Sequence, residues 1–107
     1  RAGLGGREGQ GAALGVCLDL GNWPTEVAPA EAARLLAPKV THVHVKLLSP
    51  RPEPQAQPRD FAAQLEALRQ AGYGGDFSLE YEGSGPARAG LEAGARLMRQ
   101  LWEEDQP

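Results

Sequence analysis

Residues 41–47 read Thr-His-Val-His-Val-Lys-Leu, and the fold prediction starts from this stretch. His42, His44 and Lys46 alternate with two valines and a leucine, so the polar and apolar side chains would lie on opposite faces of an extended segment. This alternation, with its β-branched residues, predicts a strand over Thr41–Leu47. The polar face holds both histidines of the chain. Taken alone, the pattern also fits a half-exposed strand with incidental histidines.

Length and composition limit the number of domains and the classes of function that the chain can have. Its 107 residues suffice for one small domain, and a net charge of −3 gives no basic surface for nucleic acid. A single cysteine, Cys17, excludes an internal disulfide and indicates a reducing compartment, which we expect to be the cytoplasm. No apolar run predicts a membrane span, and no signal peptide opens the chain. The sequence begins at Arg1 rather than at methionine, which is consistent with a fragment.

The first third of the chain predicts one strand and one helix after a glycine-rich start. Residues 1–13 lack periodicity and are expected to be a flexible or truncated lead-in to the domain at 14–107. Leu14–Leu20 is a short apolar run typical of a strand buried on both faces. After the turn Gly21–Pro24, the run Pro29–Ala37 predicts a short helix that begins at a proline and stops before another.

The second half predicts two more helix-forming segments and one more strand. Ser49–Arg59 contains four prolines in eleven residues, so we expect an extended surface loop. Asp60 is a good N-cap for the helix that follows. The remaining expected elements are a helix over Phe61–Ala71, a turn over Tyr73–Asp76, a strand over Phe77–Glu82, a helix over Ala87–Glu103 and a frayed end over Glu104–Pro107.

Strands that alternate with helices predict an α/β fold with a parallel sheet and right-handed crossovers. Three such units fit either an open doubly wound sheet or an arc of a (β/α)₈ TIM barrel. No glycine-rich phosphate-binding fingerprint follows the first strand, which weakens the dinucleotide-binding version of the open sheet. A small flavodoxin-like domain would need about five strands. We therefore predict a partial TIM barrel made of about three C-terminal βα units.

Chemically active side chains occur late in each expected strand, where barrel enzymes place their functional residues. Asp19, His44 and Glu80 would meet at one edge of the sheet, and carboxylates with an imidazole suit Mn²⁺, Mg²⁺, Co²⁺ or Zn²⁺. Structural interpretations remain open for each of them and for their neighbours. Asp19 could simply accept hydrogen bonds from the turn at Gly21–Asn22. Glu80 and Glu82 could lie on a solvated strand face, and Lys46 could be a counter-ion without a chemical role. Cys17 is expected to be a small core residue, and Trp23 is either core or the wall of a sugar-sized pocket.

Three motifs resemble the sugar phosphate isomerase/epimerase family, the xylose isomerase-like TIM barrels. They are LDLGN at Leu18–Asn22, HVHVK at His42–Lys46 and GYGGDFSLE at Gly72–Glu80, in the order and spacing of the second half of that family. The resemblance covers about residues 14–103. It implies that this chain is the C-terminal part of a barrel of roughly 250–280 residues.

The resemblance also implies roles for individual residues. Asp19, His44 and Glu80 correspond to metal ligands, and a fourth ligand, a glutamate on an earlier strand, has no counterpart here. Asn22 occupies a substrate-facing position, Lys46 matches the family lysine, and Leu47 replaces an aspartate found in many members. We expect Asn22, Trp23, His42 and Lys46 to bind substrate. The resemblance supports His42 less than His44, and Trp23 is included for its position just after the first strand. The implied catalytic residues are Glu80, which would move a proton, and Lys46, which would stabilise the enediolate.

The expected activity is therefore a divalent-metal-dependent isomerisation or epimerisation of a sugar, sugar phosphate or polyol-like substrate. Dehydratases and aldolases also occur in that family, and its DNA-repair branch, which uses more histidines, fits this acidic chain poorly. A non-catalytic barrel remnant that serves as a structural or interaction module is the alternative. The expected partner is the missing N-terminal half of the barrel or a second copy of the chain, and the isolated chain should have little activity.

Overall fold

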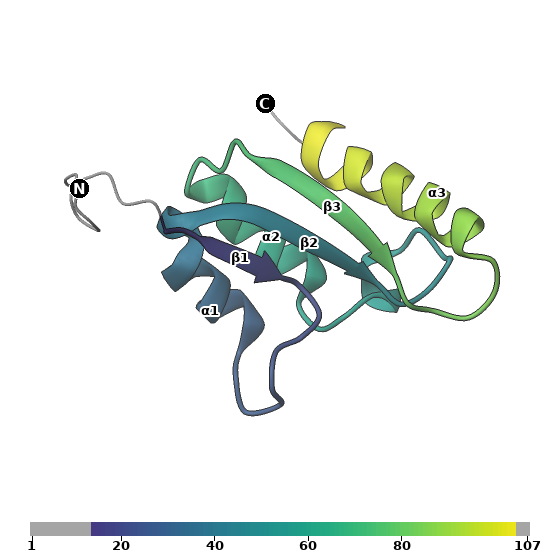
Figure 1. The fold of residues 1–107 in the computed structure, drawn as a ribbon, viewed down its shortest axis with the longest axis horizontal. Helices are drawn as coiled ribbons and strands as arrows, with labels where there is room; N and C mark the ends of the chain where they lie inside the picture. The colour runs from purple at the N-terminus through teal and green to yellow at the C-terminus, as the bar shows by residue number, and fades with distance from the viewer. Residues whose placement is uncertain (1–13, 105–107) are drawn as a thin grey trace.

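The computed structural model describes residues 14–104, in which three strands alternate with three α-helices (Figure 1). In chain order these are β1 (Val16–Asp19), α1 (Pro29–Leu36), β2 (Val40–Leu47), α2 (Phe61–Gln70), β3 (Asp76–Tyr81) and α3 (Ala87–Met98). Two short 3₁₀ turns, Ala37–Lys39 and Pro54–Ala56, and a π-helical end, Arg99–Glu104, complete the list. The predicted α/β class is confirmed.

The three strands form one parallel sheet in the order β1-β2-β3. The register places Asp19 beside His44 and Lys46 beside Glu80. The carboxyl ends of the three strands therefore lie at one edge, as predicted. The sheet is open over the described residues, with β1 and β3 at its two sides.

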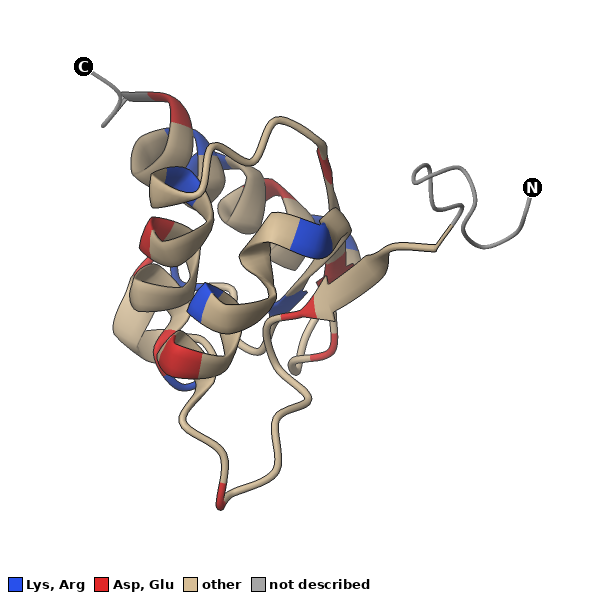
Figure 2. Ribbon diagram, turned by 90° about the vertical axis from the view of Figure 1, so that its left-hand side faces the viewer, with Lys and Arg blue, Asp and Glu red and all other residues tan. Residues whose placement is uncertain are grey.

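All three helices pack against one face of this sheet. Buried side chains of α1, α2 and α3, among them Ala33, Leu65 and Leu97, join Leu18, Val43, Val45 and Leu47 in a single apolar core. Figure 2 shows the helices gathered to one side of the strands, with both signs of charge dispersed over them. Because successive strand residues face opposite ways, the alternate side chains of each strand lie on the face that carries no helix.

The expectation that the first strand is buried on both faces is wrong. Leu14 is 77% exposed, and the strand begins only at Val16. Leu18 is buried in the core, but Cys17 points to the other face and is exposed rather than part of the core. The core is therefore one-sided in the part of the chain that the structure describes.

Helix α2 begins after Asp60, but not for the expected reason. Asp60 has a left-handed backbone, with φ of 55°, and its side chain makes no capping hydrogen bond. Its main-chain carbonyl accepts the first helical bond from the N–H of Gln64, at 2.8 Å. The helix thus starts at the predicted residue by means of the main chain alone.

The last helix changes from an α-helix to a π-helix after Met98. The continuous helix expected to Glu103 becomes a π-helical turn at Arg99–Glu104. Arg69 of α2 donates to the carbonyls of Leu101 and Trp102, and its guanidinium lies 5.1 Å from the centre of the Trp102 ring. These contacts attach the wider final turn to α2.

Two terminal expectations concern residues beyond this range. The lead-in at 1–13 and the last three residues of the frayed end, 105–107, lie outside the described residues. Within residues 14–104, none of the helices combines the length and the apolar character needed to cross a membrane.

Candidate metal centre

Asp19, His44 and Glu80 come together at the carboxyl edge of the sheet. One ligand atom from each residue can be chosen so that all three lie within 4.8 Å of one another. His44 Nδ1 is 3.4 Å from Glu80 Oε2 and 4.0 Å from Asp19 Oδ2. The three side chains are half-buried and lie on the face without helices. The structure thus brings together the residues that the sequence proposed as metal ligands.

The parallel register produces this convergence. Asp19 is the last residue of β1 and lies beside His44, and Glu80 is two positions further along its strand than Ser78, the register partner of His44. The N–H of Gly21 donates to Asp19 Oδ1 at 2.8 Å, so the turn after β1 fixes the carboxylate. The turn therefore binds the Asp19 carboxylate, as the alternative of a purely structural Asp19 requires. The other oxygen, Oδ2, is still directed at His44.

Lys46 lies among three carboxylates next to these residues. Its Nζ is 2.9 Å from Glu82 Oε2, 3.4 Å from Glu80 Oε1 and 3.7 Å from Asp19 Oδ2. The residue is only 7% exposed. The hydrogen bond to Glu82 raises the pKa of Lys46 above 10.5, helped by the charge of Asp19 and by Glu80, while burial acts in the opposite direction. Lys46 is therefore an ammonium ion at neutral pH.

The carboxylates of this cluster outnumber its one ammonium group. Asp19, Glu80 and Glu82 contribute three negative charges, Lys46 contributes one positive charge, and the excess is two negative charges when His44 is neutral. Partial solvation of Glu80 and exposure of Glu82 reduce the cost of this excess. A divalent cation would carry the balancing charge.

The separation of the donor atoms fits a small cation after modest movement. Ligands about 2.1 Å from a tetrahedral zinc ion are about 3.4 Å apart, and ligands at right angles are about 3.0 Å apart. The His44–Glu80 separation of 3.4 Å already matches, and the His44–Asp19 separation of 4.0 Å would have to shorten. The three ligand atoms together spread over as much as 4.8 Å, so the carboxylates would also have to approach each other. Three protein ligands leave further positions for substrate or water, as catalytic metal sites require.

His42 lies beside the cluster rather than in it. Its Nε2 is 2.7 Å from the hydroxyl of Ser78, and its ring meets the ring of His44 edge to face with centroids 5.3 Å apart. The residue is half-buried on the same face as His44. His42 therefore backs the His44 ring, and Ser78 is a partner that the sequence analysis did not identify.

Asn22 and Trp23 follow Asp19 in the loop after β1. Asn22 is exposed, and Trp23 is half-buried against the core. With Cys17, Asp19 and Leu36 they line a shallow hollow of about 180 Å³ at the open side of β1. Trp23 therefore packs against the core and also lines a hollow next to Asp19, while its expected role as the wall of a sugar-sized pocket stays a prediction.

Two buried glutamines were missed by the sequence analysis. Gln64 is fully buried, and Gln57 is 7% exposed. Gln64 lies three residues after Phe61 on the apolar side of α2, so a polar residue on that stripe was a usable signal. Gln57 lies between prolines in the loop after β2, where the sequence offers no comparable signal.

The proline-rich loop is more ordered than the extended surface loop that was expected. Gln57 binds the backbone of Leu48, Ser49 and Arg51 through four hydrogen bonds. At its far end Pro58 packs near Gly21, where an added Cβ would overlap Lys46 and approach Pro58. The loop therefore folds back to the edge of the sheet that carries the metal-ligand candidates.

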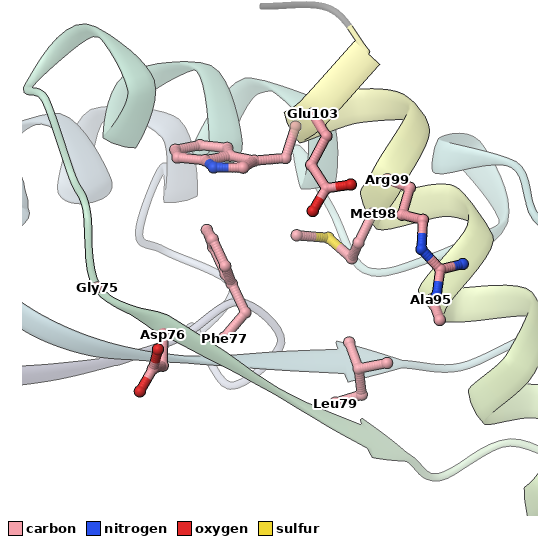
Figure 3. Close-up of a pocket in the computed structure, with 9 residues that line it drawn as sticks. Gly75, Asp76, Phe77, Leu79, Ala95, Met98, Arg99 and Glu103 are labelled. Atoms are coloured by element: carbon pink, nitrogen blue, oxygen red, sulfur yellow. The ribbon is translucent and has the colours of Figure 1, made fainter.

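A hollow of about 360 Å³ lies away from this cluster. It opens between β3 and α3, and Figure 3 shows Phe77 and Leu79 pointing from the strand toward Met98, while Asp76 points away. Its lining combines apolar side chains with the charged residues Asp76, Arg99 and Glu103. It includes Trp102, whose ring centre lies 4.9 Å from that of Phe77 in an edge-to-face arrangement. Among the described residues, the group that could hold a metal ion is Asp19, His44 and Glu80 on the opposite face, so the candidate site remains that cluster.

Comparison of the chain with models of known protein families and with curated protein sequences gave no match.

Proposed function

We propose that Asp19, His44 and Glu80 form a divalent-metal centre in a sugar isomerase or epimerase of the xylose isomerase-like kind. The convergence of these three side chains at the carboxyl edge of a parallel sheet carries the proposal. Two carboxylates and an imidazole suit Mn²⁺, Mg²⁺, Co²⁺ or Zn²⁺. The sequence motifs that resemble the family supply exactly one ligand each from three consecutive strands.

We further propose that the three βα units are an arc of a (β/α)₈ barrel rather than half of a doubly wound sheet. A doubly wound sheet places helices on both faces, and a barrel places them only on the outside. Here α1, α2 and α3 share one core on one face, and the opposite face carries the polar residues. Such a polar face would line the interior of the barrel at its catalytic end.

A bound divalent cation would supply Lewis acidity to polarise the carbonyl of a hydroxy-ketone or hydroxy-aldehyde. Glu80 is the proposed base and acid, because its carboxylate lies at the open face and can move a proton at the carbon next to that carbonyl. Lys46 holds Glu80 through Oε1 at 3.4 Å. Its ammonium group would also stabilise negative charge that develops on a substrate oxygen. Asn22, Trp23 and His42 would contact the substrate from the surrounding rim.

The second candidate is a barrel remnant without catalytic activity, and the ion pairs of Lys46 favour it. Lys46 contacts all three nearby carboxylates, so the cluster has a structural cation of its own. Networks of this kind occur in proteins for structural reasons. Under this alternative the sheet edge would serve a partner or a structural role, and metal would not bind.

Calorimetric titration with Mn²⁺ or Co²⁺ separates the two candidates. The 107-residue chain should bind one equivalent weakly, because a fourth protein ligand is missing, and His44→Ala should weaken binding at least about tenfold. His42→Ala is the matched control, since it removes a neighbouring histidine on the same face and should retain binding. An equal loss of metal affinity in the two variants, or no metal binding by the unaltered chain, would favour the non-catalytic barrel remnant.

A further inference from the structure

The peptide group between Leu20 and Gly21 is held by hydrogen bonds at both of its ends. The Leu20 carbonyl accepts a hydrogen bond from Gln64 Nε2 at 2.9 Å. The Gly21 N–H, in the same peptide group, donates to Asp19 Oδ1 at 2.8 Å. A continuous path of hydrogen bonds therefore joins the buried Gln64 side chain to the Asp19 carboxylate.

We propose that Gln64 is a positioning residue that sets the orientation of Asp19. A peptide group is planar, so a rotation that releases the Leu20 carbonyl from Gln64 also turns the Gly21 N–H away from Asp19. With Oδ1 engaged by Gly21, Oδ2 is the oxygen that faces His44 Nδ1 at 4.0 Å and Lys46 Nζ at 3.7 Å. Gln64 thereby determines which carboxylate oxygen is presented at the candidate metal centre.

Gln64 is itself held firmly. Its Oε1 accepts a hydrogen bond from the indole N–H of Trp23 at 2.8 Å, and its Nε2 also donates to the Arg59 carbonyl at 3.1 Å. The indole can only donate and a carbonyl can only accept, so the orientation of the amide follows from its partners. Arg59 in turn donates to the Pro24 carbonyl at 2.9 Å, which joins the same loop from its other side.

A structural role would produce a different result from a positioning role. If Gln64 only satisfied buried polar groups, its loss would destabilise the whole domain and affect every protected amide alike. If it positions Asp19, its loss disturbs the Gly21 N–H more than its neighbours. The Leu20 N–H, which donates to the His44 carbonyl at 3.1 Å, is an internal reference one residue away.

Gln57 provides a matched control. It is another buried glutamine that binds loop backbone, with bonds of 2.8 and 2.9 Å to the Leu48 N–H and the Arg51 carbonyl. It holds the loop after β2 rather than the turn after β1, and it makes no hydrogen bond to Leu20 or Gly21. Its removal therefore tests the loss of a buried amide without breaking the path to Asp19.

The first experiment measures hydrogen exchange of the Leu20 and Gly21 amides by NMR in the metal-free 107-residue chain. Gln64→Met should speed exchange at Gly21 by about tenfold relative to Leu20, and Gln57→Met should leave that ratio unchanged. Gln64→Leu is the second variant if the methionine variant does not fold. The proposal is overturned if the ratio is unchanged in the Gln64 variant, or if Gly21 already exchanges freely in the unaltered chain.

The second experiment rests on the proposed metal centre and titrates the same proteins with Co²⁺. Gln64→Met should weaken binding about 10–100-fold, as is usual when a partner that orients a ligand is lost, and Gln57→Met should change it little. Equal weakening in the two variants would overturn the positioning role. If the unaltered chain binds no Co²⁺, the metal centre fails, but the exchange ratio still decides whether Gln64 orients Asp19.

Discussion

Among single residues, Lys46 has the greatest influence on the candidate site. Its buried ammonium contacts Asp19, Glu80 and Glu82, and it lies under Gly21 and the end of the proline-rich loop. Because these carboxylates raise its pKa, Lys46 remains charged at neutral pH and cannot accept a proton as a general base. Proton transfer in the proposed reaction therefore falls to a carboxylate, for which Glu80 is the candidate.

The raised pKa of Lys46 predicts how stability changes in alkaline solution. The folded state holds the proton more tightly than the unfolded state, so the contribution of Lys46 is fully present below the unfolded pKa of 10.5 and is lost as the pH rises through the higher folded value. Urea denaturation of the unaltered chain should show this loss, and Lys46→Met should lack it. The measurement is the free energy of unfolding across this pH range.

Tyr73 also titrates in alkaline solution, so its contribution must be removed from that experiment. Burial raises the pKa of Tyr73 above 10.0. The ionisation of Tyr73 therefore also lowers the free energy of unfolding as the pH rises, as the loss of the Lys46 proton does. The comparison should therefore be made in a Tyr73→Phe background. An alkaline loss of stability of the same size with and without Lys46 would contradict the ion-pair account.

At the scale of the helices and strands, close packing between α3 and β2 depends on a glycine. Gly94 faces the fully buried Leu47, and a methyl group at position 94 would overlap the Leu47 side chain. Overpacking a core costs about 1–3 kcal/mol, and alanine regains about 1 kcal/mol of helix propensity. Gly94→Ala should therefore lower the free energy of unfolding by about 1 kcal/mol in a denaturation experiment.

The exposed residue Arg96, two positions further along α3, gives a control for this prediction. Arg96→Ala should change the free energy of unfolding by less than about 0.5 kcal/mol. If Gly94→Ala were more stable than the unaltered chain, the close contact between α3 and β2 would be wrong.

Much of the secondary structure was predictable from the sequence, because the periodicity of apolar residues is a local property. The alternation in Thr41–Leu47 gave β2 nearly in full, and Pro29 gave the start of α1. The strand ends also predicted that Asp19, His44 and Glu80 would converge, since parallel strands bring their carboxyl ends to one edge.

The remaining features depend on contacts between distant residues. The π-helical turn at Arg99–Glu104 is attached to Arg69, 30 residues or more earlier in the chain, and the role of Gln57 depends on how a proline-rich loop folds back. Burial of Leu14–Leu20 on both faces was wrong because the helices all pack on one face. Local pattern does not determine which face a crossover helix will cover.

Over residues 14–104, the whole molecule has one covered face and one polar face, and the two outer strands of its sheet each have an unpaired edge. The apolar side chains of β3 are only half-buried, and a hollow of about 360 Å³ adjoins them (Figure 3). Unpaired strand edges next to apolar surface favour association with another chain. In the proposed barrel these sides would pair with further strands.

This arrangement predicts that the 107-residue chain associates with itself in solution. Sedimentation equilibrium should show a weight-average mass above 11.4 kDa that increases with concentration. Leu79→Lys, in the hollow beside β3, should reduce the association. Leu35→Lys is the control, because Leu35 is 76% exposed on α1, away from that edge. A strictly monomeric chain at all concentrations would contradict this account of the open sheet.

The most direct measurement of the central claim is an anomalous-diffraction map from crystals of this chain soaked in Mn²⁺ or Co²⁺. The account predicts a single strong peak about 2.0–2.2 Å from Asp19 Oδ2, His44 Nδ1 and a Glu80 oxygen, and no such peak in His44→Ala. A peak elsewhere, or density that shows only Lys46 and its three carboxylates after soaking, would contradict the metal centre and leave a structural network of ion pairs.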